Sequence, residues 1–205
     1  MKFHLGPAPA NPGFSDQSSW TLVRISEIRR WQLMAFPIAV INMAIVTGLW
    51  LWRTPAWDHL RSMRWPIPIP GFVITLILIL ICHEFIHALM HPQAGGSRHS
   101  VIGFWPSRML LYAVYNGTVT RQRSLMILLM PLVTLSLVPA ILSALLGRYS
   151  FWLAYATVLN AFVSAGDVLL ILTLFKQVPP GATMNGSGWK SYWQLKTKKA
   201  HFQPD

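Results

Sequence analysis

The amino-acid sequence predicts an all-α polytopic membrane protein with four transmembrane helices, and three observations lead to this fold class. Of the 205 residues, 53% are hydrophobic and only 11% are charged, whereas a soluble domain carries about 25% charged residues. Four apolar stretches have a length close to the roughly 20 residues that a helix needs to cross the hydrocarbon core of a bilayer. Several of the 10 tryptophans fall at the ends of these stretches, where amphipathic rings sit at the level of the headgroups.

The apolar stretches divide the chain into a membrane domain and two polar ends. We expect the four helices at about Gln32–Trp52, Phe72–Met90, Ser124–Leu146 and Ser150–Phe175. Only residues 147–149 separate the last two, which is typical of a tight hairpin of antiparallel helices. Residues 1–30 form an N-terminal segment unlike a cleavable signal peptide, residues 31–176 the membrane domain, and residues 177–205 a basic tail. Proline and glycine predict that the first 20 residues are loosely ordered.

The net charge of +11 suits a nucleic-acid-binding protein, but the distribution of the basic residues argues against that class. They concentrate before the first helix, between the second and third helices, and in the tail. These segments share one side of a four-helix chain, and an excess of Lys and Arg marks the cytoplasmic side of a membrane protein. We therefore expect both termini in the cytoplasm, with the lipid bilayer rather than nucleic acid beside the basic residues.

The loop between the second and third helices contains two short runs that are rich in β-branched and aromatic residues. These runs are Ser100–Trp105 and Leu110–Tyr115, and Pro106, Ser107 and Arg108 lie between them. Such runs on either side of a turn are typical of a β-hairpin. The fold class therefore includes a short membrane-associated β-hairpin in this loop. An irregular, partly buried connector is the alternative that the sequence leaves open.

The second predicted helix contains the H-E-x-x-H pattern, as His83-Glu84-Phe85-Ile86-His87. Residues four apart lie on one helix face about 6 Å from each other, so the two imidazoles can converge on one tetrahedral ion such as Zn²⁺. Glu84 follows the first histidine and projects near the same ion, where its carboxylate can take a proton from a metal-activated water. A buried, hydrogen-bonded polar cluster without a metal is the alternative.

Asp167 is the predicted third ligand, because a catalytic zinc ion usually has three protein ligands. Of the 6 acidic residues, only Glu84 and Asp167 lie inside predicted spanning helices, where an ionisable side chain is costly and marks a functional candidate. Position 85 lies about 20 Å along its helix and Asp167 about 25 Å along its own. Both helices run in the same direction, so these sites fall at similar depth. The alternative is a counter-ion or packing role without metal contact.

His91 is a rival third ligand, since it lies four residues after His87 on the same helix face. However, His83 and His91 are about 12 Å apart along a straight helix. The two imidazoles cannot share one ion unless the helix breaks between them. We therefore expect His91 to be a histidine of the helix interface.

The fourth predicted helix carries further polar residues on the face of Asp167. Asn160, Ser164 and Asp167 are spaced i, i+4, i+7, which places them on one side of the helix. Asn160 could donate to the oxyanion of a tetrahedral intermediate or to the substrate backbone, and Ser164 could support a metal ligand. Small polar residues that pack helices together are the alternative reading.

These residues resemble a known family, the putative zincin peptidases of the bacterial inner membrane. The resemblance covers about residues 72–175 and rests on His83–Leu89, on Pro131, and on Asn160 with Ser164–Asp167. More distantly, the chain is similar to the site-2 group of intramembrane metalloproteases, in which an Asp on a later helix completes the zinc site and a membrane-associated β-hairpin helps to present substrate. The resemblance implies zinc on His83, His87 and Asp167, catalysis by Glu84, and a multi-pass protein of the inner membrane.

The sequence thus predicts a membrane-embedded zinc metallopeptidase that hydrolyses peptide bonds of membrane or membrane-proximal substrates. Its expected partners are a membrane protein or peptide as substrate and the lipid bilayer. Two other function classes use the same ligands. One is a membrane protein that binds or transports metal without hydrolysis, and the other is a metal-dependent hydrolase of a lipid or a small amide. A transport path would favour several sites, whereas the polar residues here concentrate at one depth.

Overall fold

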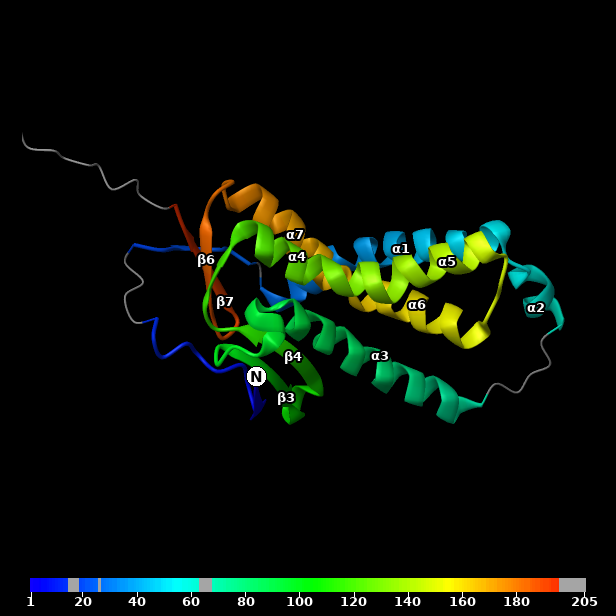
Figure 1. Ribbon diagram of the computed structural model, residues 1–205, viewed down its shortest axis with the longest axis horizontal. Helices are drawn as coiled ribbons and strands as arrows, with labels where there is room; N and C mark the ends of the chain where they lie inside the picture. Colours follow the sequence, from blue (N-terminus) through cyan, green and yellow to red (C-terminus); the bar gives the residue numbers. More distant parts are fainter. Residues whose placement is uncertain (15–18, 26, 63–67, 196–205) are drawn as a thin grey trace, which may run out of the picture.

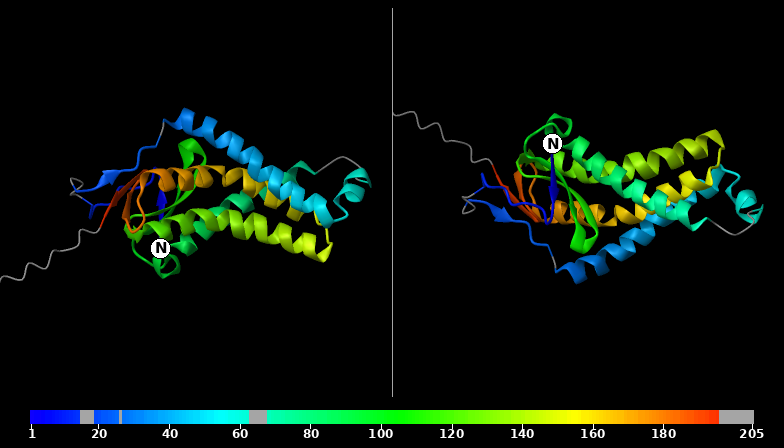
Figure 2. Two further views of the ribbon diagram at one scale, coloured as in Figure 1. Left: turned by 90° about the horizontal axis from the view of Figure 1, so that it is seen from above. Right: turned by 90° about the horizontal axis from the view of Figure 1, so that it is seen from below.

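The computed structural model describes residues 1–14, 19–25, 27–62 and 68–195. Within them the chain forms an elongated bundle of helices with two small β-sheets gathered at one end (Figure 1). A short helix, α2 (Ala56–Ser62), lies at the opposite end, beyond the last turn of α1. Two further views show the sheets at the same end of the bundle from above and from below (Figure 2).

Four helical segments among the described residues are long and apolar enough to cross a membrane. In chain order they are α1 (Ile28–Arg53); α3 (Ile69–Met90); α4 (Arg121–Leu132), a π-helical turn (Val133–Leu137) and α5 (Val138–Leu146) in one run; and α6 (Phe151–Val163) followed by α7 (Ala165–Gln177). The four predicted helices are therefore confirmed as elements, with ends that differ by a few residues. The predicted tight connection between the last two is also present, because Gly147 ends α5 with a φ of 62°, a conformation that glycine adopts without a Cβ penalty.

The helices bury little of their apolar surface against one another. Large side chains such as Leu33 and Ile69 are 66% and 75% exposed, and a bilayer would cover them. The buried contacts instead involve small groups and hydrogen bonds between helices. Trp50 Nε1 in α1 donates to Thr157 Oγ1 in α6 at 2.9 Å, and Asn42 Nδ2 donates to the Ala161 carbonyl at 3.2 Å. Such interhelical bonds hold membrane helices together where a hydrophobic driving force is weak.

The predicted hairpin is confirmed as strands β3 (Ser100–Trp105) and β4 (Leu110–Tyr115), which pair antiparallel. A third strand, β1 (Lys2–Leu5), pairs in parallel with β3, so the sheet order is β1-β3-β4. Strand β4 therefore lies at an edge of this sheet, on the side that contacts α3. The edge position brings backbone groups of β4 next to α3.

A second sheet has the order β2-β7-β6-β5 and is entirely antiparallel. Its strands are β2 (Thr21–Leu22), β5 (Thr118–Thr120), β6 (Thr183–Ser187) and β7 (Lys190–Gln194). It joins the N-terminal segment, the loop before α4 and the residues after α7. The sheet thus fastens both ends of the described chain to one end of the helical bundle.

The expectation of a single hairpin and loosely ordered ends is incomplete, since two sheets are present. Gly188 has a φ of 60° and turns β6 into β7, so a polar, glycine-containing stretch forms a hairpin although its composition is that of a loop. Strands β1 and β2 are short and pair with residues far along the chain, which leaves no local pattern to detect. The basic stretch Lys196–Lys199 lies outside the described residues.

Candidate metal centre

The two histidines of the H-E-x-x-H pattern lie near the end of α3 and point into the bundle. Their residues are only 3% (His83) and 6% (His87) exposed. Their Nε2 atoms are 3.2 Å apart. Asp167 Oδ2 lies 3.1 Å from Nε2 of His83 and 3.4 Å from Nε2 of His87. The structure therefore brings the three predicted ligands to one point.

Asp167 follows a short interruption of the fourth long helical segment at Ser164. Helix α6 ends at Val163 and α7 begins at Ala165, so Asp167 lies in the first turn of a new helix. A carboxylate is favoured at a helix N-terminus, where the backbone N–H groups carry partial positive charge. In the described part of the chain, the buried Oδ2 atom of Asp167 accepts no hydrogen bond. This oxygen is thus held beside the imidazoles without a donor.

The outer nitrogen of each imidazole faces an oxygen acceptor. Nδ1 of His87 donates to the Ile127 carbonyl at 2.8 Å. Nδ1 of His83 lies 2.9 Å from Oδ1 of Asn160. The orientation of this amide is fixed, because Asn160 Nδ2 donates to the Pro131 carbonyl at 3.0 Å and to Ser136 Oγ at 2.8 Å. Each neutral imidazole therefore carries its proton on Nδ1 and a lone pair on Nε2.

These contacts provide a test of whether the residues fit a zinc ion. Two nitrogen lone pairs and a carboxylate oxygen face one another, an arrangement that is repulsive unless a cation lies between them. Tetrahedral zinc, with bonds of roughly 2.0–2.2 Å to nitrogen and oxygen, separates its ligand atoms by about 3.3 Å. The observed separations are 3.1, 3.2 and 3.4 Å. Donor type, protonation and spacing therefore all fit zinc.

Glu84 lies beside this cluster and is not one of the converging ligands. It is half-buried, and its carboxylate lies near the backbone of Ala113 in β4. The charges of His83, His87 and Asp167 act on it at close range. Glu84 is thus held between the ligand cluster and the edge strand of the first sheet.

The two further polar residues predicted on the fourth helix are both fully buried. The Nδ2 hydrogens of Asn160 are directed to Pro131 and Ser136, while its oxygen meets His83. Both ends of the Asn160 amide are therefore engaged. Ser164 Oγ has no hydrogen-bond partner among the residues that the structure describes. Ser136 and Ile127 also support the site, and the H-E-x-x-H pattern gives no indication of either.

His91 lies at the end of α3, outside the ligand cluster, and is 1% exposed. Its Nδ1 is 2.7 Å from Ser100 Oγ at the start of β3. Arg123 donates from Nε to the Met90 carbonyl at 2.8 Å and from Nη2 to the His91 carbonyl at 3.2 Å. Burial, followed by the charges of His87 and Arg123, lowers the pKa of His91 to about 4. This neutral histidine connects the hairpin to the end of α3.

The low pKa of His91 predicts a loss of stability in mild acid. As the pH falls, His91 takes up a proton in the unfolded chain, where its pKa is about 6.5, before it does so in the folded chain. The contribution of His91 to the free energy of unfolding is therefore complete above pH ~6.5 and is lost as the pH falls towards ~4. The loss amounts to up to about 3 kcal/mol. We expect the free energy of unfolding to fall less between pH 7 and pH 5 in His91→Gln than in wild type, when both are measured by denaturant titration. Equal pH dependence in the two proteins would contradict the assignment.

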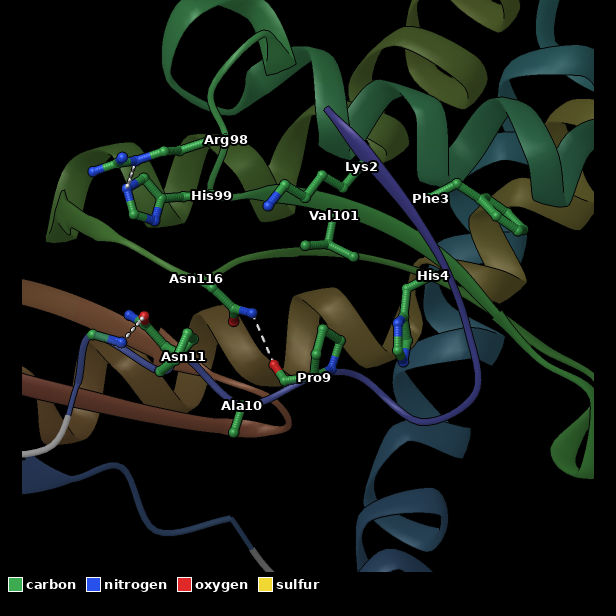
Figure 3. A pocket seen from close by; sticks show the side chains of 12 residues that line it. Lys2, Phe3, His4, Pro9, Ala10, Asn11, Arg98, His99, Val101 and Asn116 are labelled. Atoms are coloured by element: carbon green, nitrogen blue, oxygen red, sulfur yellow. Dashed lines mark hydrogen bonds between the residues drawn. The ribbon is translucent and has the colours of Figure 1, made fainter.

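A separate cavity of about 550 Å³ lies between the N-terminal segment and the hairpin (Figure 3). Its lining includes the cationic residues Lys2 and Arg98, and contains none of the ligand-cluster residues. Asn116 Nδ2 donates to the Pro9 carbonyl at 2.8 Å beside it, which attaches the N-terminal segment to the end of β4. The cavity is therefore distinct from the metal centre.

Comparison with known proteins agrees with the chemistry of the cluster. A family model described as "Putative zincin peptidase" matches residues 76–183, which is more than half of the chain and includes all three clustered ligands and Glu84. A search of curated proteins found no match, and neither did a search of solved structures. Membership of this family suggests a zinc metallopeptidase. The chain belongs to the family described as "Putative zincin peptidase".

Proposed function

We propose that this protein is a membrane-embedded zinc metallopeptidase that hydrolyses peptide bonds of membrane or membrane-proximal substrates. The observation that carries the proposal is the convergence of His83, His87 and Asp167 inside helices that are apolar enough to span a bilayer. Burying these groups together is unfavourable without a bound cation. Family membership suggests the reaction class, and the cluster contains the side chains that could bind the metal ion.

In this proposal His83, His87 and Asp167 hold the ion, and Asp167 provides the negative charge that partly balances it. When bound, zinc polarises a carbonyl group and lowers the pKa of water, so that a nucleophile is available near neutral pH. Glu84 accepts the proton of the attacking water on a carboxylate oxygen and then delivers it to the nitrogen of the departing amine. The C–N bond breaks as the new C–O bond is completed. The Glu84 carboxylate lies near the backbone of Ala113 in β4.

The edge of the first sheet favours an extended peptide as substrate over a lipid or a small amide. The N–H of Asn116, just after β4, bonds to the carbonyl of His99, just before β3, at 2.9 Å. By alternation the backbone groups of Leu111, Ala113 and Tyr115 therefore point to the outer edge of β4. In the described part of the chain no strand pairs with that edge. A substrate segment that has left its helical form could add to it by strand addition and would then pass beside Glu84.

The metal-transport alternative receives less support from the arrangement of buried polar groups. His83, Asn160 and Ser136 form one hydrogen-bonded chain that ends on the backbone of α6 at Thr157. Among the described residues, only one group of three His, Cys, Asp or Glu side chains converges, whereas a transport path would favour several sites. We also infer, from the concentration of basic residues on one side of the predicted topology, that the sheets face the cytoplasm and that the metal centre lies in the cytoplasmic half of the bilayer.

Metal analysis combined with a cleavage assay tests the proposed function. We expect purified protein in liposomes to hold one zinc ion per chain and to cleave a membrane-spanning peptide, to lose both properties with a chelator, and to regain both with added zinc. An anomalous-scattering map at the zinc edge should place the ion between the three ligands. Uptake of zinc into the liposomes without any cleavage would instead establish the transport function.

Removal of the Asn160 side chain is expected to weaken zinc binding although Asn160 does not touch the ion. Residues that orient a ligating histidine typically contribute 10–100-fold to metal affinity, and Asn160 Oδ1 is the partner of His83 Nδ1. We expect Asn160→Ala to raise the dissociation constant for zinc by about 10–100-fold in a competition titration. Asn42→Ala is the matched control, since it removes another buried asparagine that bonds between helices. An equal loss of affinity in both variants would show a general packing effect.

A further inference from the structure

The hydrogen bond that orients His87 uses a carbonyl which a regular helix would not leave free. Ile127 lies within α4, where each carbonyl accepts from the N–H of the residue four positions later. The residue four positions after Ile127 is Pro131, which has no N–H. The Ile127 carbonyl therefore lacks its helical donor, and Nδ1 of His87 bonds to it at 2.8 Å.

The same proline also contacts the support of the other histidine. Pro131 is fully buried, and its own carbonyl accepts from Asn160 Nδ2 at 3.0 Å. This bond helps to fix the amide orientation that presents Oδ1 to His83. Pro131 therefore affects the Nδ1 atoms of both imidazoles. Its missing N–H leaves the Ile127 carbonyl free for His87, and its own carbonyl helps to orient the amide that meets His83.

A buried carbonyl that a proline leaves unpaired needs another donor, because an unsatisfied backbone group inside a protein is costly. In this site the donor is an imidazole instead of a hydroxyl or a bound water. The bond is therefore mutual: the carbonyl gains its missing donor, and the imidazole gains an acceptor that admits only the tautomer with the proton on Nδ1. That tautomer leaves the Nε2 lone pair directed at Asp167 and His83.

We propose that Pro131 is a positioning residue for the metal centre, which acts by withholding an N–H from the Ile127 carbonyl so that this carbonyl fixes the tautomer and the orientation of His87. The inference concerns the imidazole itself, and its importance for catalysis rests on the proposed metallopeptidase function. If Pro131 served only to bend the helix, restoring an N–H at position 131 would leave the tautomer of His87 unchanged.

Pro131→Ala is the direct test, because alanine restores the N–H with the smallest change of shape and is the best helix former. The restored N–H competes with His87 for the Ile127 carbonyl. In metal-free protein at alkaline pH, ¹⁵N spectra of the histidine side chains should show His87 shifting from the Nδ1–H tautomer towards the Nε2–H tautomer. Zinc affinity should fall by about 10–100-fold, whereas the thermal unfolding temperature should be equal to that of wild type or higher.

Pro37→Ala is the matched control, since Pro37 is also inside a membrane-spanning helix and its replacement likewise restores a helical N–H. It should leave both the His87 tautomer and the zinc affinity unchanged. The inference is overturned if Pro131→Ala keeps His87 in the Nδ1–H form with wild-type zinc affinity. The tautomer is read without metal or substrate, so a shift would uphold the inference even if the wild-type protein proved unable to cleave peptides.

Discussion

Replacement of Glu84 by Gln is expected to slow peptide cleavage by about 10²–10⁴-fold, which is the usual contribution of a positioned general acid–base. Gln has the shape of Glu and can occupy the same place beside Ala113, but its amide cannot take up a proton from water. The three converging ligands are untouched. Zinc content per chain, measured by elemental analysis of the purified variant, should therefore equal that of wild type while the cleavage rate falls.

Glu27→Gln is the matched control for this variant, because Glu27 precedes α1 and lies outside the ligand cluster. We expect it to cleave and to bind zinc as wild type does. Two outcomes would contradict the role of Glu84. Full cleavage by Glu84→Gln would exclude it as the proton carrier, and loss of zinc from that variant would make Glu84 a ligand.

The elements that sequence predicts well are those with a strong local signal. The four long helices follow from apolar stretches of sufficient length. Strands β3 and β4 have the predicted bounds because both runs are rich in β-branched or aromatic residues and a proline lies between them. The meeting of Asp167 with the two histidines also follows from local information, since position along a spanning helix fixes depth. Depth alone does not show that α7 begins at Ala165, an interruption that places Asp167 in a first helical turn.

The features that sequence does not predict depend on contacts between distant residues. The second sheet joins strands from both ends of the chain, and no pattern within one short strand identifies its partner. Asn160 offers both a donor and an acceptor, so spacing alone allows it to bind an oxyanion or to orient a ligand. Only the positions of Pro131 and Ser136 show that its donors are engaged. Ile127 contributes a backbone carbonyl, a role that its side chain cannot signal.

Replacement of Asp167 by Asn is expected to lower zinc affinity by more than ~100-fold, since loss of a group that merely orients a ligand already lowers metal affinity 10–100-fold. Asn has nearly the same shape but removes the negative charge and one strong oxygen donor. At alkaline pH, where the imidazoles are neutral, its amide hydrogens can instead donate to the Nε2 atoms that lie 3.1 and 3.4 Å from Oδ2 in the wild type. The free energy of unfolding of the metal-free variant, measured at that pH, should therefore not fall.

Zinc titration and chemical denaturation of metal-free protein measure these two effects separately, with Asp58→Asn in α2, at the opposite end of the bundle, as the control. Opposite responses, weaker zinc binding without a loss of metal-free stability, identify a site whose charges are arranged for an absent cation. A purely structural carboxylate gives the reverse result, because removing its charge would destabilise the fold and leave zinc binding unchanged. The direction of the two changes thus separates a metal ligand from a counter-ion of the histidines.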